Sequence, residues 1–338
     1  TEILNRIGSG TYVDPGRQTM TEYLREWLVA IQRTVRPGTW TSYRSNIERH
    51  VVPRLGGREL RQLGASHLNI LYAELLEDGR CDGAGGLSPR TVRYTHTILH
   101  RALRDAARWG KLPRNPADMA DPPKSRPPEM KTWRRDELRR FLTSVEDDRL
   151  YAAWLLVATT GLRRGELLGL RWSDVDFEAS RAAIRQTLSS VGGKVTFSTP
   201  KTTKSRRSLT LDPTTLAALR HHCDAQDKER ATWAEVYADL DLVFCREDGT
   251  PLRPDSITRR FHDLSRRAGV PLVRLHDVRH TYASLGLAAG THPKIMAERL
   301  GHATVGITLD TYSHVAPSLA RQAADDLATL ILGPSESD

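Results

Sequence analysis

The organisation of this chain is decided by a stretch that reads Asp121-Pro-Pro-Lys-Ser-Arg-Pro-Pro-Glu-Met-Lys131. Four of the seven residues from 122 to 128 are prolines. Proline has no backbone N–H and disrupts a helix interior, and proline-rich segments favour extended chain. We therefore expect a linker over residues 121–131. At 338 residues, the chain is long enough to form a separate domain on each side of it.

The segment before the linker has helical patterns. Thr19-x-x-Glu22 resembles a capping box, in which each end of the motif bonds the backbone of the other. Apolar residues recur at helical spacing from Trp40 to Val51, and Ser88-Pro89 is typical of a helix start. Further helices are expected near 66–77 and 88–109. Residues 18–120 are thus predicted to form a small helical bundle.

The helix expected at 88–109 carries a basic stripe. At 100° per residue, five arginines fall within a sector of about 80°: Arg90, Arg93, Arg101, Arg104 and Arg108. The apolar residues of this helix lie on the opposite face. A charged, solvated face is the ordinary explanation for such a stripe. Because Asp105 lies only at its edge and no acidic residue interrupts it, we favour contact with phosphates.

After the linker, the pattern becomes mixed. Helices are expected near 134–146, 149–160, 164–170, 213–230, 255–268, 277–289, 293–300 and 304–313, with a last amphipathic helix from about 317 to 332. Between Val175 and Leu211 the sequence alternates and is punctuated by turns, which predicts a small antiparallel sheet. The fold class is therefore mainly α, with a helical first domain and a mixed α+β second domain.

Composition restricts the classes of partner. The net charge of +9 favours a polyanion, and nucleic acid is the commonest such partner. The three cysteines are far apart, with no C-x-x-C pair, so neither a disulfide framework nor a cysteine zinc site is indicated. No segment approaches the roughly 18 apolar residues that span a bilayer. We expect a soluble, cytoplasmic protein without membrane contact, associated with the nucleoid when active.

Four clusters in the second domain carry groups suited to chemistry. They read Thr160-Gly-Leu-Arg163-Arg-Gly-Glu166, Pro200-Lys201-Thr-Thr-Lys204-Ser-Arg-Arg207, His276-Asp-Val-Arg279-His280, and Leu300-Gly-His302 followed by Asp310-Thr-Tyr312. Each alone has an ordinary structural explanation. Together they supply what phosphodiester transfer needs.

Attack on a phosphodiester builds negative charge on its non-bridging oxygens, and a pair of arginines can hold these oxygens bidentately. Arg163 and Arg279 are suited to that role. His276 and His302 can add hydrogen bonds or move protons, because imidazole titrates near neutrality.

The remaining groups suit the two ends of the broken bond. Lys201 can protonate the leaving 5′ oxygen. Tyr312 can attack and form a phosphotyrosyl linkage, which conserves the bond energy so that a strand can be resealed without ATP.

In this order and at roughly this spacing, the four clusters resemble the tyrosine recombinase (phage integrase) family. The resemblance covers nearly the whole chain and implies a helical, SAM-like core-binding domain at 18–120 and a catalytic domain at 132–316. It implies Arg163 as the first catalytic arginine, Lys201 as the hairpin lysine, His276 and Arg279 from an H-x-x-R pattern, His302 from Leu-Gly-His, and Tyr312 as the nucleophile. It also implies Glu166 as the acidic support of the first arginine, and a reaction without metal or other cofactor.

Some assignments stay open in the sequence. Lys204 competes with Lys201 for the scissile phosphate, although Pro-Lys-Thr matches better at Lys201. Arg164 competes with Arg163, where the Gly-Leu-Arg register favours the latter. His280 is expected to be a buried supporting residue. Lys204, Arg206 and Arg207 are also expected to contact DNA.

Both ends of the chain invite expectations from the same resemblance. The chain begins with Thr1, and Thr11-Tyr-Val-Asp-Pro15 resembles the junction after an arm-binding domain in integrases of phages and conjugative elements. Residues 1–17 are therefore expected to be a remnant of such a domain. The tail at 317–338 is expected to form a helix that packs on its own domain or, as we favour, docks on a neighbouring subunit in a homo-tetramer. The implied partners are double-stranded DNA attachment sites and accessory DNA-bending and excision proteins.

Two rival hypotheses belong to other classes. His276 and His280, at i and i+4, resemble part of the H-E-x-x-H pattern of metal-dependent hydrolases, but the glutamate is missing and no third ligand stands out. A DNA-binding regulator without catalysis also fits the charge and the helical first domain. The integrase hypothesis alone accounts for the arginines and Tyr312 together.

Overall fold

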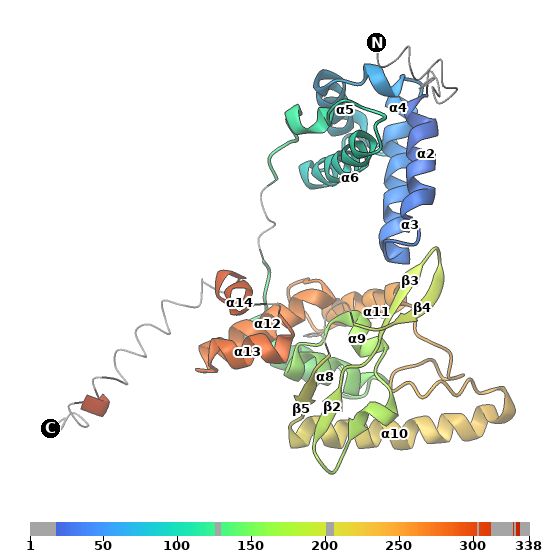
Figure 1. Cartoon of the computed structure of the whole chain (residues 1–338). Coiled ribbons are helices and arrows are strands. Elements are labelled where there is room, and N and C mark those ends of the chain that lie inside the picture. The colour runs from blue at the N-terminus through green and yellow to red at the C-terminus, as the bar shows by residue number, and fades with distance from the viewer. Residues whose placement is uncertain are drawn as a thin grey trace. The chain divides into compact units, whose positions relative to one another are not determined.

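The computed structural model describes residues 18–125, 130–200, 206–302, 304–311, 327 and 329–331; for 310 and 311 it describes the backbone alone. The chain divides into two compact units, Thr1–Pro128 and Glu129–Asp338. The division falls inside the proline-rich stretch 121–131. Unit 1 is blue to blue-green in Figure 1, and unit 2 runs from green to red.

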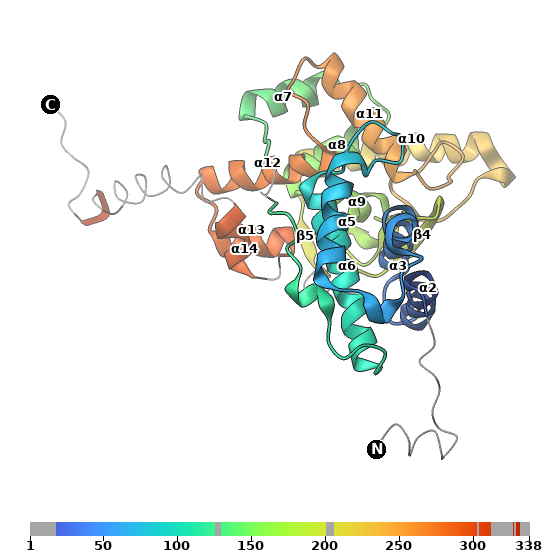
Figure 2. The same cartoon turned by 90° about the horizontal axis from the view of Figure 1, so that it is seen from above.

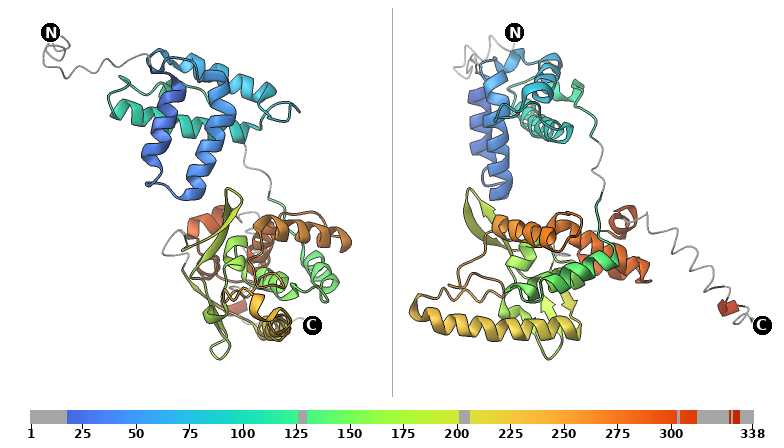
Figure 3. Two further views of the ribbon diagram at one scale, coloured as in Figure 1. Left: turned by 90° about the vertical axis from the view of Figure 1, so that its right-hand side faces the viewer. Right: turned by 180° about the vertical axis from the view of Figure 1, so that it is seen from behind.

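Unit 1 is helical throughout its described part, as predicted. Its elements are α2 (Met20–Ile31), α3 (Pro37–Asn46), the π-turn η1 (Ile47–Val51), α4 (Val52–Leu55), η2 (Leu60–Gln62), α5 (Ala65–Asp78), α6 (Pro89–Arg108) and η3 (Pro116–Met119). Helices α2 and α3 lie side by side as a hairpin (Figure 3). The predicted capping box is present: Thr19 N–H donates to Glu22 Oε2 at 2.8 Å, and Glu22 N–H donates to Thr19 Oγ1 at 3.3 Å.

Helix α6 packs with the face that the sequence predicted. Val92, Ile98, Leu99 and Leu103 are all fully buried in the core of unit 1. Asp105, predicted at the edge of the basic stripe, is instead buried, and its Oδ2 accepts a 2.8 Å hydrogen bond from Trp27 Nε1. The core of this unit therefore contains one buried carboxylate whose bond ties α6 to α2.

Unit 2 combines helices with short strands. Its elements are α7 (Arg135–Ser144), α8 (Tyr151–Thr160), α9 (Arg164–Leu168), η4 (Trp172–Asp174), β1 (Val175–Asp176), β2 (Arg181–Ala183), β3 (Thr187–Val191), β4 (Lys194–Ser198), β5 (Ser208–Thr210), α10 (Pro213–Trp233), η6 (Ala234–Val236), α11 (Pro254–Arg267), α12 (Leu275–Ala288), α13 (Pro293–Leu300) and α14 (Val305–Thr311). The predicted helices are present, with ends shifted by a few residues. The helix predicted beyond 317 lies outside the described residues, apart from 327 and 329–331.

The antiparallel region forms two sheets rather than the single one predicted. One has the order β1-β2-β5, with Ala182 paired to Leu209, and the other is the β3-β4 hairpin. Ala182 and Leu209 are buried, whereas most of β4 is exposed. The first sheet therefore belongs to the core of unit 2, and the hairpin extends from it (Figure 1).

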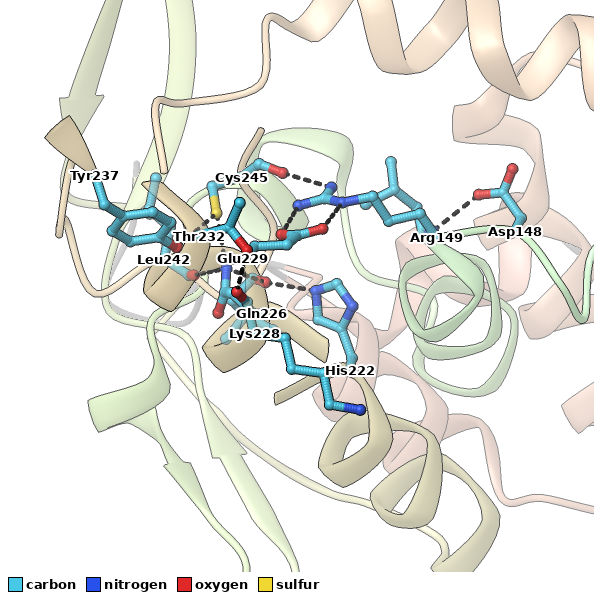
Figure 4. Close-up of polar contacts among 12 residues, drawn as sticks. Asp148, Arg149, His222, Gln226, Lys228, Glu229, Thr232, Tyr237, Leu242 and Cys245 are labelled. Carbon is cyan, nitrogen blue, oxygen red and sulfur yellow. Dashed lines mark hydrogen bonds and ion pairs between the residues drawn. The ribbon is translucent and has the colours of Figure 1, made fainter. Parts of the chain in front are cut away.

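Two groups of helices complete unit 2. Helices α12, α13 and α14 contact one another in sequence at one end of the unit (Figure 2). The long α10 is held elsewhere by buried polar contacts (Figure 4). In that cluster Arg149 donates to both oxygens of Glu229 at 2.5 Å and to the Cys245 carbonyl at 2.9 Å, while Gln226 donates to the Leu242 carbonyl at 3.2 Å.

None of the helices described is both long and apolar enough to cross a bilayer.

Neighbouring leucines on α5 give a direct test of the core of unit 1. Leu75 is fully buried and Leu76 is 39% exposed. Leu75→Ala removes the same atoms as Leu76→Ala, but only Leu75→Ala leaves a cavity in the core. It should therefore lower the free energy of unfolding of unit 1 by about 2–5 kcal/mol. Hydrogen exchange of α5 and α6 peptides, measured by mass spectrometry on the full chain, reports this difference. Equal effects of the two substitutions would contradict the packing described.

Candidate active site

The first predicted cluster forms a tight turn between α8 and α9. Gly161 ends α8 with φ 65°, and a Cβ there would lie 2.6 Å from the Tyr282 ring, so glycine meets both demands. Arg163 is the N-cap of α9, and its N–H donates to Glu166 Oε2 at 3.0 Å. The Arg163 side chain turns back as well, with Nη1 2.7 Å from Glu166 Oε1. The three-residue spacing thus lets Glu166 hold both the backbone and the guanidinium of Arg163.

Arg279 reaches the same turn from α12. Its Nη1 donates to the Gly161 carbonyl at 2.8 Å and its Nη2 to the Leu300 carbonyl at 2.5 Å. The side chain is 2% exposed, whereas that of Arg163 is 35% exposed. The two arginines that the sequence paired are therefore together, with Arg163 nearer to solvent and Arg279 beneath it.

The fourth cluster completes the site from the end of α13. Gly301 closes this helix in the left-handed region, with φ 66°, and its carbonyl accepts from Arg163 Nη2 at 3.1 Å. His302 follows directly, with Nδ1 2.8 Å from Thr308 Oγ1 on α14. Thr308 was missed in the sequence. Its hydrogen bond fixes the orientation of the His302 ring.

The site holds its histidines in the neutral form. Burial, followed by the positive charges of Arg279 and Arg163, lowers the pKa of His302 to about 4. Burial and then the neighbouring His280 lower the pKa of His276, also to about 4. Part of the His276 side chain nevertheless remains at the surface, within reach of a bound anion. A bound anion would oppose the positive charge and favour protonation of either ring.

The structure corrects the expectation for Arg207. Its side chain is 7% exposed, donates from Nη2 to Glu166 Oε2 at 2.9 Å and from Nε to the Arg299 carbonyl at 2.6 Å. A guanidinium that is both buried and ion-paired with a buried carboxylate is not an open DNA-binding group. The sequence held an indication of this burial. Residues two positions apart lie on the same face of a strand, so Arg207 shares a face with Leu209 and Leu211, and both leucines are buried. The adjacent Arg206 is exposed.

The structure distinguishes between the residues that compete for the same role. Arg164 points to α11, where its Nη1 donates to Thr258 Oγ1 at 2.8 Å, so Arg163 is the arginine that joins the site. His280 is half-buried, and its ring lies edge-on to that of His276 with centroids 5.3 Å apart. Among the described residues, no three histidine, cysteine, aspartate or glutamate side chains are grouped to bind a metal. The two histidines of the metallohydrolase hypothesis therefore have no third ligand in the described part of the chain.

Three predicted residues lie outside the described residues: Lys201, Lys204 and Tyr312. The described backbone leads to each of them. Strand β4 ends at Ser198, shortly before Lys201, and β5 begins at Ser208. Helix α14 ends at Thr311, directly before Tyr312.

In unit 1 the basic stripe of α6 is largely open. Arg90, Arg93, Arg104 and Arg108 are exposed, whereas Arg101 is partly buried, 5.7 Å above the Tyr43 ring. Arg108 pairs with the buried Asp105 at 3.2 Å, so the stripe is not wholly free of acidic partners. Arg90, Arg93 and Arg104 form no ion pair with any residue that the structure describes.

Comparison with known proteins agrees with this arrangement. Residues 131–318 match the model of the phage integrase family, and residues 19–76 match the N-terminal SAM-like domain of phage integrases. A XerC-like tyrosine recombinase of Caldanaerobacter subterraneus is 27% identical over 98% of this chain and 88% of its own length. The ICEBs1 integrase of Bacillus subtilis is 26% identical, over 90% and 81%.

Solved structures show the same fold. The Tn1549 transposon integrase, in complex with a circular intermediate DNA, covers 90% of this chain and 99% of its own with a TM-score of 0.74 at 20% identity. A lambda integrase dimer bound to a COC′ core site covers 87% and 95%, with a TM-score of 0.63 at 16% identity. The chain belongs to the phage integrase family: it is a tyrosine recombinase, which cleaves and rejoins DNA at specific sites. Neither rival hypothesis finds support in these relatives.

The lowered pKa of His302 predicts acid sensitivity of unit 2. The unfolded chain takes up this proton near pH 6.5 and the folded chain only near pH 4, so stability is lost as the pH falls through this window. His302→Gln keeps a hydrogen-bonding side chain but cannot titrate there. We expect urea unfolding of the variant to depend less steeply on pH between 4.5 and 6.5 than that of the wild type. Identical slopes would show that His302 is not held neutral by the fold.

Proposed function

We propose that Arg163, Arg279 and His302 bind the scissile phosphate and that Tyr312 attacks it, forming a 3′-phosphotyrosyl bond and a free 5′ hydroxyl. The observation that carries this proposal is the convergence of the two arginines on neighbouring carbonyls, those of Gly301 and Leu300. Their guanidinium groups come from different helices but lie beside two successive peptide groups, immediately before His302. Two cations so placed can stabilise the charge that develops on a phosphate in attack.

The histidines act as neutral donors in this mechanism. His302 uses Nδ1 in its bond with Thr308, which leaves Nε2 to donate to a non-bridging oxygen. His276 lies at the exposed start of α12 and serves the phosphate from the other side. A phosphate anion partly offsets the arginine charges, so either ring can also take up a proton as the reaction proceeds.

Lys201 is the proposed general acid for the leaving 5′ oxygen, with Lys204 as the alternative. Both belong to the segment between β4 and β5, and β5 begins one residue after Arg207. Since Arg207 is bonded to Glu166, the segment that carries the lysines is anchored at one end to the arginine site. His280 is assigned a supporting role beside His276.

Unit 1 is the proposed core-binding domain, at residues 18–120, and unit 2 contributes the catalytic domain, at 132–316. The exposed arginines of α6 and Arg206 of unit 2 are assigned to DNA phosphates, which position a duplex without specifying its sequence. The relatives include integrases of the mycobacterial phages L5 and D29, which supports integration and excision of a mobile element as the biological role. The substrates would then be pairs of double-stranded attachment sites.

Strand exchange by this chemistry requires four active sites. A homo-tetramer is therefore proposed, in which two subunits cleave first and the other two repeat the exchange. The tail at 317–338 would dock on a neighbouring subunit and so connect its own Tyr312 to assembly, and the alternative is packing on its own domain. Accessory proteins that bend DNA or favour excision would set the direction.

A covalent trap tests the nucleophile. The probe is a core duplex, selected by binding to the full chain from a random pool, with a nick beside the cut so that the short strand is lost. The wild type should accumulate a covalent complex that peptide mass spectrometry maps to Tyr312. Tyr312→Phe should bind the duplex with unchanged Kd and form no complex. Tyr151→Phe, which removes another phenol of unit 2, should still form it; a complex with Tyr312→Phe, or one mapped to another residue, would refute the proposal.

Salt dependence tests the stripe of α6. Removing one phosphate interaction should reduce the slope of log Kd against log salt by about 0.9. Arg93→Gln and Arg104→Gln are expected to weaken core duplex binding and to lower the slope by about that amount each. Arg80→Gln is the matched control, because Arg80 already pairs with Asp82 at 2.6 Å. A slope unchanged by the α6 substitutions would leave the stripe as an ordinary solvated face.

A further inference from the structure

The carbonyl groups at the end of α13 are each taken by a different arginine. Arg207 Nε donates to the Arg299 carbonyl at 2.6 Å, Arg279 Nη2 to the Leu300 carbonyl at 2.5 Å, and Arg163 Nη2 to the Gly301 carbonyl at 3.1 Å. The last carbonyls of a helix have no partner within it and carry partial negative charge. Three guanidinium groups thus hold three successive peptides immediately before His302.

Arg207 differs from the other two arginines in its second contact. Its Nη1 and Nη2 lie 3.1 and 2.9 Å from Glu166 Oε1 and Oε2, and the Glu166 side chain is 2% exposed. Oε1 of the same carboxylate accepts from Arg163 Nη1 at 2.7 Å. A Cβ on Gly301 would come within 3.0 Å of Arg207 Nη1, so the glycine also leaves room for this guanidinium. Arg207 therefore bridges the Glu166 carboxylate and the end of α13.

We propose that Arg207 is a positioning residue for DNA cleavage, which fixes the guanidinium of Arg163 through Glu166 and, through the Arg299 carbonyl, the end of α13 that leads to His302. The inference rests on the proposed roles of Arg163 and His302. Arg207 itself does not touch the phosphate. Arg207 lies directly before β5, so in sequence it connects the stretch that contains Lys201 and Lys204 to the site of Arg163 and His302.

A purely structural ion pair is the alternative. Buried ion pairs add little net stability compared with apolar residues of the same shape, so stability alone is a weak reason to keep three charges here. The charged groups that face Glu166 in the described part of the chain are Arg207 and Arg163. Burial raises the pKa of Glu166, but Arg207 and then Arg163 lower it further, and the net result is an ionised carboxylate. Without Arg207, Arg163 would be the one remaining described residue that lowers the pKa of Glu166 against the effect of burial.

Loss of Arg207 should therefore introduce a new pH dependence. In Arg207→Met, we expect the pKa of Glu166 to rise, so that acid protonates it and releases Arg163. At saturating protein, covalent complex formation by the full chain on the nicked core duplex should fall on the order of 100-fold at the acid end of a pH 5–9 series. It should recover partly toward pH 9, while the Kd for the duplex stays near the wild-type value.

Three further variants separate positioning from structure. Glu166→Gln combined with Arg207→Met cannot titrate, so its rate should be low and lack the acid limb. Arg207→Lys keeps a charge beside Glu166 but cannot bridge to the Arg299 carbonyl, so it should be slower than wild type with the wild-type pH profile; it also serves if Arg207→Met does not fold. Arg246→Met removes an exposed charge elsewhere in unit 2 and should match the wild type.

The outcomes decide the matter. An acid limb in Arg207→Met that is absent from the double variant supports the inference. A wild-type profile in Arg207→Met overturns it, as does an equal loss at every pH in the single and double variants with a lowered melting temperature. Failure of the wild type itself to form a covalent complex would instead refute the proposed function, and this inference with it.

Discussion

The carboxylate of Glu166 lies between the guanidinium groups of Arg163 and Arg207, almost without access to water. A buried carboxylate is unstable as an ion unless it is paired, and an arginine cannot give up its proton in compensation. Each of these three residues therefore depends on the others. The trio joins the turn after α8, the start of β5 and the end of α13, so a single electrostatic requirement fixes the relative places of three segments far apart in the chain.

The same arginines also satisfy the carbonyl groups at the end of α13. Its carbonyls would otherwise need water or a capping group, and they receive three arginines instead. Burial, together with this concentration of positive charge, lowers the pKa of His302 and keeps its ring neutral. In the proposed mechanism, an entering phosphodiester would meet groups already held in place, so little reorganisation would be needed when charge develops on it. The hydrogen bond from Thr308 to His302 extends this order to α14, the helix that leads to Tyr312.

Unit 1 follows a different principle. Its α6 has one face buried in the core and the other lined with arginines. Electrostatic attraction between arginine and phosphate acts at long range, so such a surface needs exposed side chains rather than exact positions. The exceptions show how packing alters such a surface. Asp105 turns inward to accept from Trp27, and Arg101 leans over Tyr43, so neither behaves as the helical wheel predicted. A wheel assigns each residue a direction from the helix axis, whereas a long side chain can bend toward any partner within reach.

Proline content, periodicity and motif spacing are local properties of the chain, and they were enough to predict the two-part organisation, most helices, the family, and three residues that meet at the site: Arg163, Arg279 and His302. It predicted that Glu166 supports Arg163, since three residues in a helix start bring the two together. Three features followed only from packing in three dimensions: Arg207 shares that carboxylate, Arg164 faces α11, and the strands form two sheets. The first two of these outcomes depend on contacts between segments far apart in the chain, such as Glu166 with Arg207. Burial and partner distance, which decide whether an arginine binds DNA or holds the fold, exist only once those segments have packed.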